Sequence, residues 1–343
     1  MSILFSSDKA HLIAEIGVNH EGDIERARSQ IRLAVEGGAD SVKLQYYNAK
    51  LLASELAEAY WDQSSEPEQS QGELFKKYDS FGVQEIADLS EFTRALGSRF
   101  GLSIFHLGAA EEVAPFVDYF KVASGDITFH ALLREMITFG KPIVVSTGAS
   151  MEDEVAQVVQ LLADCPDVEA AFLQCTLSYP TRIENANILS IDTLKVVVGG
   201  APIGVSDHIP DRGNLRFQLA FALGARVFEK HFSDTPGEPG NDHYHSWGPE
   251  EFRMLRRSLV EAESILGSPA LFLDAELPAR QGARRSLFFA TDLKKGHRLT
   301  RDDVIALRPA TGIPASDLDH YVGKVLTSDA GGRTLVSPAM FED

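Results

Sequence analysis

Eight short apolar runs, most of them followed by a stretch with helical spacing of apolar residues, constrain the fold of this chain more than any other feature. Near-continuous apolar strands that alternate with amphipathic helices are typical of a parallel sheet buried on both faces. Eight such units predict a (β/α)8 TIM barrel. The runs cover residues 11–20, 39–47, 99–106, 119–126, 141–148, 169–179, 201–208 and 225–232.

Polar and charged residues follow or end these apolar runs. A barrel of this kind places its active site at the carboxyl ends of its strands, and a packed barrel needs no such residues there for stability. The sequence therefore predicts that this end of the barrel is an active site. Its candidate residues are Glu15, Asn19, His20, Lys43, Gln45, Ser124, Asp126, Ser146, Thr147, Thr176, Tyr179, Asp207, His208, Glu229, Lys230 and His231.

The composition of the 343 residues excludes several classes of protein. A formal net charge of −18 argues against nucleic acid as a partner, because phosphate backbones attract clustered Lys and Arg. No apolar run reaches the roughly 18 residues of a membrane span, and the N-terminus lacks the apolar core of a signal peptide. The two cysteines, Cys165 and Cys175, are not expected to form a disulfide, which indicates a cytoplasmic protein.

The chain divides into a large and a small part. A helix predicted over residues 249–266 closes the barrel domain, residues 1–268, and residues 269–282 have no sustained periodicity and are interpreted as a linker. Residues 283–343 contain short β-branched and aromatic runs broken by Gly-containing turns, which predict a small, mostly-β domain. A domain of this size has a limited core and is expected to dock on another surface.

One long insertion interrupts the barrel pattern at residues 48–81. It is polar, too long for an ordinary βα loop, and lies at the predicted catalytic end. Its aromatic residues, Tyr60, Trp61, Phe75 and Tyr78, favour an ordered lid over a disordered loop.

Two histidines end neighbouring strands and are candidate metal ligands. His208 ends the seventh run and His231 lies at the end of the eighth, so both imidazoles can point at one ion. Two His ligands with open positions suit a first-row divalent metal that also binds substrate or water. The alternative is that each is a hydrogen-bonded residue of the barrel mouth with no metal.

Two lysines, Lys43 and Lys121, are candidate anion-binding residues, and Lys230 could add to a local positive charge. Together with Ser124 and Ser146 they favour binding of phosphate or carboxylate. One alternative is a Schiff-base lysine, as in a barrel aldolase. Another is simple charge balance with Glu15 or Asp126.

Five further candidate residues carry weaker signals. Burying Glu15 without a partner would be costly, so we expect it to pair with a lysine, bind a hydroxyl group or act as a base. Tyr179 is either a site residue or a loop anchor. Asp242, His243 and His245 lie in a turn-rich loop and either face the metal or are merely solvated.

These residues lie in segments that resemble the N-acetylneuraminate (sialic acid) synthase family in order and spacing. The resembling segments are AEIGVNHEGD, SVKLQYY, FKVASGDI, VVSTGAS, CTLSYPT, GVSDH and FEKHF. The tail, from RRSLFFATDLKKGHRLTRDDV through RPATGI to VGK, resembles the family's C-terminal antifreeze-like (SAF) domain. Nearly the whole chain is covered.

The resemblance implies a transferase that condenses phosphoenolpyruvate with an N-acylated hexosamine, giving a nine-carbon 2-keto-3-deoxy acid and phosphate. It also implies a divalent metal, first Mn²⁺ with Mg²⁺ or Co²⁺ as alternatives, and a homodimer in which each SAF domain caps the partner's barrel. The implied metal ligands are His208 and His231, and the implied phosphoenolpyruvate contacts are Glu15, Lys43, Lys121, Ser124, Ser146 and Ser206. The implied sugar contacts are Asp126, Tyr179, Asp242 and, from the other subunit, Arg308.

The chain departs from the family pattern at positions that bear on the acceptor sugar. Ser103 is followed by Ile-Phe-His where many relatives have Thr-Pro-Phe-Asp, Asp126 replaces Glu, and Leu177 replaces Asn. These changes keep the reaction class but leave the acceptor open, with legionaminic, pseudaminic or another nonulosonic acid as the product. A Schiff-base aldolase using Lys121 or Lys43, and a non-catalytic sugar-binding SAF protein, remain the alternatives.

Overall fold

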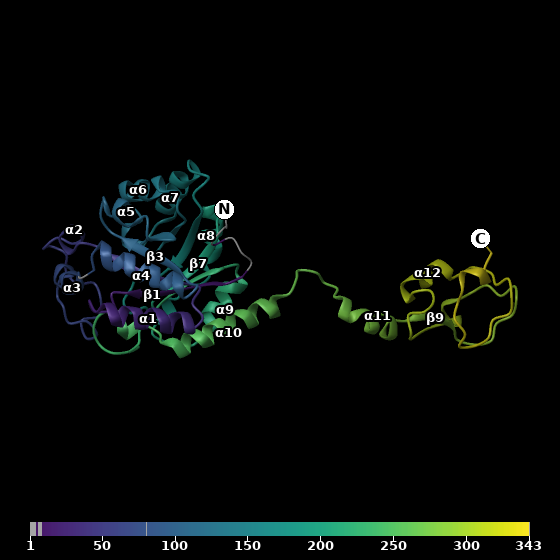
Figure 1. Ribbon diagram of the computed structural model, residues 1–343. Coiled ribbons are helices and arrows are strands. Elements are labelled where there is room, and N and C mark those ends of the chain that lie inside the picture. The colour runs from purple at the N-terminus through teal and green to yellow at the C-terminus, as the bar shows by residue number, and fades with distance from the viewer. Residues whose placement is uncertain (1–4, 6–8, 80, 343) are drawn as a thin grey trace. The chain divides into compact units, whose positions relative to one another are not determined.

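The computed structural model describes residues 5, 9–79 and 81–342, and the chain divides into two compact units, residues 1–267 and 268–343. In the first unit, eight parallel strands pair in sequence order, and the eighth pairs with the first, so the sheet is a closed barrel surrounded by helices (Figure 1). This confirms the predicted TIM barrel. Its strands are β1 (His11–Gly17), β2 (Ser41–Tyr46), β3 (Arg99–Ile104), β4 (Tyr119–Val122), β5 (Ile143–Ser146), β6 (Ala170–Cys175), β7 (Ile203–Asp207) and β8 (Val227–His231).

The helices of the first unit follow the predicted periodicity. Apolar residues recur with helical spacing at 24–35, 152–162 and 215–223, and each stretch forms a helix within a residue of these bounds. The helix predicted over residues 249–266 forms with those bounds. Their apolar faces are buried in the main core, which lies between the barrel and its helices. The helices are α1 (Ile24–Glu36), α2 (Ala49–Leu52), α3 (Gln71–Tyr78), α4 (Val83–Ala95), α5 (Ala109–Val113), α6 (His130–Thr138), α7 (Glu152–Ala163), α8 (Ser190–Val198), α9 (Leu215–Ala222) and α10 (Pro249–Leu266).

A second, smaller core fills the barrel interior. It contains Ile13 of β1, Tyr119 of β4, Val144 of β5 and Val227 of β8. Side chains two positions apart on a strand point to the same side, so the residue two positions after each of these also faces the interior, nearer the catalytic end. The alternation therefore aims particular polar side chains into the barrel mouth.

The second unit has its own core and a small antiparallel sheet. Strand β9 (Ser286–Phe289) pairs with β10 (Val304–Leu307), and isolated bridges such as Leu293 with Ala330 extend the β pairing. Leu287, Phe289 and Leu326 are among its buried apolar residues, and Leu318 and Tyr321 of α12 (Leu318–Tyr321) pack in the same core. This is the small, mostly-β architecture that the sequence predicts.

The segment predicted as a linker, residues 269–282, contains a short helix. Helix α11 (Leu277–Ala283) has no buried residue. Because none of its faces is packed, its sequence lacks the apolar periodicity that identifies the barrel helices.

Candidate active site

A cavity of about 330 Å³ opens at the carboxyl ends of the barrel strands. It is lined by every barrel residue that the resemblance implicates, although these residues come from six strands and several loops. They are Glu15, Lys43, Lys121, Ser124, Asp126, Ser146, Tyr179, Ser206, His208, His231 and Asp242. Arg308 lies in the second unit, after β10, and is exposed.

Two buried lysines line the cavity, and each lies beside a buried carboxylate. Lys43 forms an ion pair with Glu15, to which it is adjacent in the β1–β2 register, and donates to the Ser103 hydroxyl at 2.9 Å. Lys121 donates to the Ser146 hydroxyl at 2.7 Å and lies 3.6 Å from Glu229. Each lysine therefore has a carboxylate near it and also lines the cavity.

Glu229 is among the strand-end candidates of the sequence, although the family resemblance implies no role for it. It accepts a hydrogen bond from Ser206 at 2.9 Å and is only 3% exposed. Burial alone would raise its pKa, but Lys121 and Lys43 outweigh this and keep the pKa below its usual range. The signal was present in the sequence: Glu229 lies two positions after Val227, and so shares its interior face.

The same alternation corrects the prediction for Lys230. This lysine points away from the cavity, where it pairs with Asp207 at 2.7 Å and lies over the Trp247 ring. Arg216 binds the same carboxylate through Nε at 2.8 Å and Nη2 at 2.9 Å. Lys230 and Asp207 therefore stabilise the layer between barrel and helices and add no charge to the site.

The predicted lid, residues 48–81, is ordered over the described part of the segment and contributes to the cavity wall. Its backbone is tied to the catalytic loops, since Asp62 donates to the Tyr179 carbonyl at 3.0 Å and Gly240 donates to that of Ser65 at 2.7 Å. The cavity is also lined by the four aromatic residues on which the prediction of a lid rests, Tyr60, Trp61, Phe75 and Tyr78.

Three histidine rings gather at one side of the cavity. The ring centroids of His208 and His231 are 5.2 Å apart, as the adjacent strand ends predict. His245 joins them at 4.6 Å from His231 and 5.7 Å from His208, and is fully buried. Burial, the largest cause, lowers the pKa of His208 to about 4 and those of the other two well below the usual value. Neutral imidazoles keep the lone pairs that metal binding requires.

Asp242 lies between two of these rings. Its carboxylate oxygens are 3.4 Å from Nδ1 of His231 and 3.7 Å from Nε2 of His245, and one donor atom from each of the three residues lies within 4.8 Å of the others. Burial and the nearby Glu15 raise the pKa of Asp242 to about 7. The donor set of imidazoles and a carboxylate fits a divalent transition metal.

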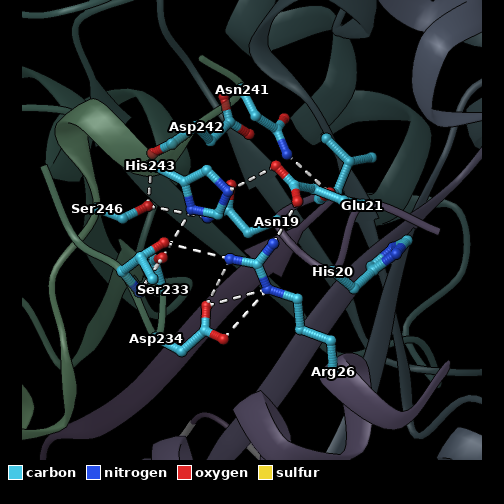
Figure 2. Close-up of polar contacts among 12 residues, drawn as sticks. Asn19, His20, Glu21, Arg26, Ser233, Asp234, Asn241, Asp242, His243 and Ser246 are labelled. Atoms are coloured by element: carbon cyan, nitrogen blue, oxygen red, sulfur yellow. Dashed lines mark hydrogen bonds and ion pairs between the residues drawn. The ribbon is translucent and has the colours of Figure 1, made fainter. Parts of the chain in front are cut away.

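A polar network holds the loop that carries Asp242 and His245 (Figure 2). Arg26 binds Asp234 with two nitrogens, at 3.0 and 3.1 Å, and also contacts Glu21. His243 lies 2.7 Å from the Ser233 hydroxyl and 3.3 Å from Glu21. His243 is therefore bound away from the metal candidates, and the prediction that it is merely solvated is also wrong, because it is only 2% exposed.

Comparison with known proteins identifies the family. The model of the NeuB family matches residues 30–270, and that of the SAF domain matches residues 284–342. The chain belongs to the NeuB family. This confirms the resemblance seen in the sequence and makes the chain an enzyme of the synthase type.

Individual relatives cover nearly the whole chain. An N,N'-diacetyllegionaminic acid synthase from Legionella pneumophila is 34% identical over 96% of this chain and 94% of its own length. A pseudaminic acid synthase from Campylobacter jejuni is 30% identical over 95% of each chain. The crystal structure of an N-acetylneuraminic acid (sialic acid) synthetase from Leptospira borgpetersenii, in complex with citrate, matches with a TM-score of 0.70 and 28% identity, covering 79% of this chain and 90% of that one.

No helix among the described residues has both the length and the apolar character needed to cross a membrane. Both cysteines, Cys165 and Cys175, are free thiols, as the sequence predicts.

The electrostatics of Asp126 give a first testable prediction. Burial raises its pKa to about 6, and Lys121 acts in the opposite direction. In ¹³C NMR of the protein with labelled Asp carboxyls, the signal lost in Asp126→Asn should titrate near pH 6, so that the carboxylate forms only as the pH rises through that value. Lys121→Met should raise this midpoint, whereas Lys230→Met, which removes an outward-facing lysine, should not. A wild-type midpoint near 4 would contradict the geometry.

Proposed function

We propose that this protein is a nonulosonic acid synthase that condenses phosphoenolpyruvate with an open-chain N-acylated hexosamine. The products are a nine-carbon 2-keto-3-deoxy acid and inorganic phosphate. The observation that carries the proposal is the single cavity of a NeuB-family barrel in which all eleven implicated barrel residues meet. The free thiols suit a reducing cytoplasm, where we place the reaction.

The lysine side of the cavity suits the anionic substrate. Lys43 and Lys121 offer two ammonium groups on the floor, and the hydroxyls of Ser103 and Ser146 are already oriented by hydrogen bonds from them. Charge-assisted hydrogen bonds of this kind bind phosphate and carboxylate strongly. Ser103 thereby supplies a hydroxyl in the region where the relatives' threonine is absent.

Other residues of the cavity wall suit the acceptor sugar. Asp126, Tyr179 and Asp242 provide polar atoms for hydroxyl groups, and the lid adds an apolar wall. Leu177 adds another apolar side chain at the position where sialic acid synthases have Asn. An apolar wall favours N-acyl and deoxy positions, so we infer an acceptor of the kind that leads to legionaminic or pseudaminic acid rather than plain N-acetylmannosamine. The apolar residues of this cavity wall include Leu52, Leu74, Phe75 and Phe105.

We propose that His208 and His231 hold a divalent metal, Mn²⁺ in first place. When bound, the metal supplies Lewis-acid polarisation of the sugar aldehyde. Both rings are held neutral by burial, and Nδ1 of His231 has no hydrogen-bond partner among the described residues, which fits a metal ligand.

The chain's own residues then direct the condensation. C3 of phosphoenolpyruvate forms a bond to the aldehyde carbon, C2 becomes electron-deficient, and water adds to C2. The resulting tetrahedral intermediate loses phosphate by cleavage of the C2–O bond, leaving the keto acid. Lys43 and Lys121 neutralise the departing phosphate and the carboxylate, and Glu15 stabilises the electron-deficient C2 or accepts a proton from the water. Burial raises the pKa of Glu15, which suits it to a proton-accepting role.

The reaction itself is tested by phosphate release. With phosphoenolpyruvate, Mn²⁺ and a panel of N-acylated hexosamines, the enzyme should release phosphate only with its acceptor, and EDTA should abolish turnover. With ¹⁸O in the bridging position of phosphoenolpyruvate, mass spectrometry should find the label in the phosphate. Label retained in the keto acid would show P–O cleavage and overturn the mechanism, and release that survives metal removal would overturn the role of the metal.

We further propose a homodimer in which the SAF domain of one subunit supplies Arg308 to the partner's barrel. A guanidinium can donate two parallel hydrogen bonds to sugar oxygens, and Arg308 is exposed on its own domain.

Subunit mixing tests this arrangement. Arg308→Ala and His231→Ala should each be nearly inactive alone, but mixed subunits should regain activity, because one site of the heterodimer has both an intact barrel and an intact cap. Glu15→Gln mixed with His231→Ala is the matched control, since both barrels then remain defective. If subunits exchange, as shown by native mass spectrometry, and activity does not return, the cap does not act across subunits.

A further inference from the structure

His245 is a buried histidine for which neither the family resemblance nor the proposed mechanism has a use. It belongs to the short 3-10 helix His243–His245, which follows Asp242. In a 3-10 helix, side chains three positions apart lie on the same side. Asp242 and His245 therefore point together toward His231, while His243 between them points to Ser233 and Glu21.

The loop that carries His245 is fixed in this orientation. Asn19 donates to the Ser246 hydroxyl at 3.0 Å, and Ser246 donates to the Asp242 carbonyl at 2.6 Å (Figure 2). Asn241 donates to the Val18 carbonyl at 2.8 Å. These contacts bracket the 3-10 helix on both sides, so the direction of the imidazole is set by the fold.

Neither ring nitrogen of His245 has a hydrogen-bond partner among the described residues, although the side chain is fully buried. Oδ1 of Asp242 is 3.7 Å from Nε2 of His245, beyond hydrogen-bond range. Leaving a buried polar group without a partner destabilises the folded state. The Nδ1 atom of His231 is unsatisfied in the same way. Two unsatisfied imidazoles side by side point to a shared ligand.

We propose that His245 is a third imidazole ligand of the divalent metal, in addition to His208 and His231, with the Asp242 carboxylate within reach of the same ion. The inference rests on the metal dependence put forward under the proposed function.

The spacing of the rings fits a shared ion. A metal–nitrogen bond of about 2.1 Å places the centres of imidazoles on one ion about 4.5–5.5 Å apart. The three centroid distances in this site are 4.6, 5.2 and 5.7 Å. Two of the three distances lie in that range, and the distance between His208 and His245 exceeds it by about 0.2 Å.

A third imidazole changes which metals bind well. Nitrogen ligands favour Co²⁺ and Zn²⁺, whereas Mg²⁺ prefers oxygen ligands. Removing His245 should therefore weaken Co²⁺ binding more than Mg²⁺ binding. A residue that only supports the fold of the loop would weaken both metals to a similar degree.

Metal titration of the full-length, metal-stripped protein tests the proposal without an activity assay. In isothermal titration calorimetry, His245→Ala should weaken Co²⁺ binding about 100-fold, at the upper end of the losses seen when groups that support metal ligands are removed. His245→Phe, which fills the space without a donor atom, should behave alike. His320→Ala, which removes an exposed histidine of the second unit, is the control and should bind like the wild type.

X-ray absorption spectroscopy of bound Co²⁺ distinguishes a residue that binds the metal from one that only lies near it. The wild-type spectrum should fit three imidazoles, and that of His245→Phe should fit two. Unchanged Co²⁺ affinity in both variants, or two imidazoles in the wild type, would overturn the role of His245. If wild type binds no metal at all, this inference and the metal dependence fall together. If metal binding depends on His245 but no acceptor yields phosphate, only the proposed function fails.

Discussion

The rest of the site depends on two ion pairs among four buried side chains at the barrel mouth. Glu15 pairs with Lys43, and Lys121 lies 3.6 Å from Glu229, all at 3% exposure or less. An isolated charge in such a place would be strongly disfavoured, so each group is tolerable only because its partner is fixed by the register of neighbouring strands. The balance of two positive and two negative groups keeps both lysines in the cavity, where an anionic substrate can exchange partners with the carboxylates.

Much of this arrangement of charged residues could be predicted from the sequence, because strands that follow one another in the chain lie side by side in a closed parallel barrel. The apolar runs predict the eight strands, and ten of the sixteen residues predicted at their ends line the cavity. The other six do not line it: Asn19, His20, Thr147, Thr176, Asp207 and Lys230. What strand ends alone do not tell is the side to which each residue points. Counting every second residue from the interior core would have selected Glu229 and rejected Lys230, since they are neighbours on β8 with opposite directions.

The loop residues were less predictable for a different reason. Asp242, His243 and His245 follow β8 in a turn-rich segment with no periodicity, so their direction depends on tertiary contacts with Asn19 and Arg26, more than 200 positions away in the chain. The sequence could offer only solvation or metal binding as alternatives. The structure separates them: His243 is bound to the network of Figure 2, whereas Asp242 and His245 face His231. The acceptor sugar of the proposed reaction could not be predicted from the sequence either. The lid contributes to the cavity wall, and its sequence has no regular apolar periodicity.

The central claim is that the alternation of strand residues makes the barrel mouth a binding site for phosphoenolpyruvate. Calorimetric titration of phosphoenolpyruvate into Lys121→Met and Lys230→Met tests it most directly, because the two lysines are both buried but point to opposite sides of the sheet. Lys121→Met should weaken binding at least about 30-fold, the equivalent of about 2 kcal/mol for a buried charged partner, and Lys230→Met should bind like the wild type. Equal affinity of Lys121→Met and wild type, in a protein whose circular dichroism is unchanged, would contradict the account.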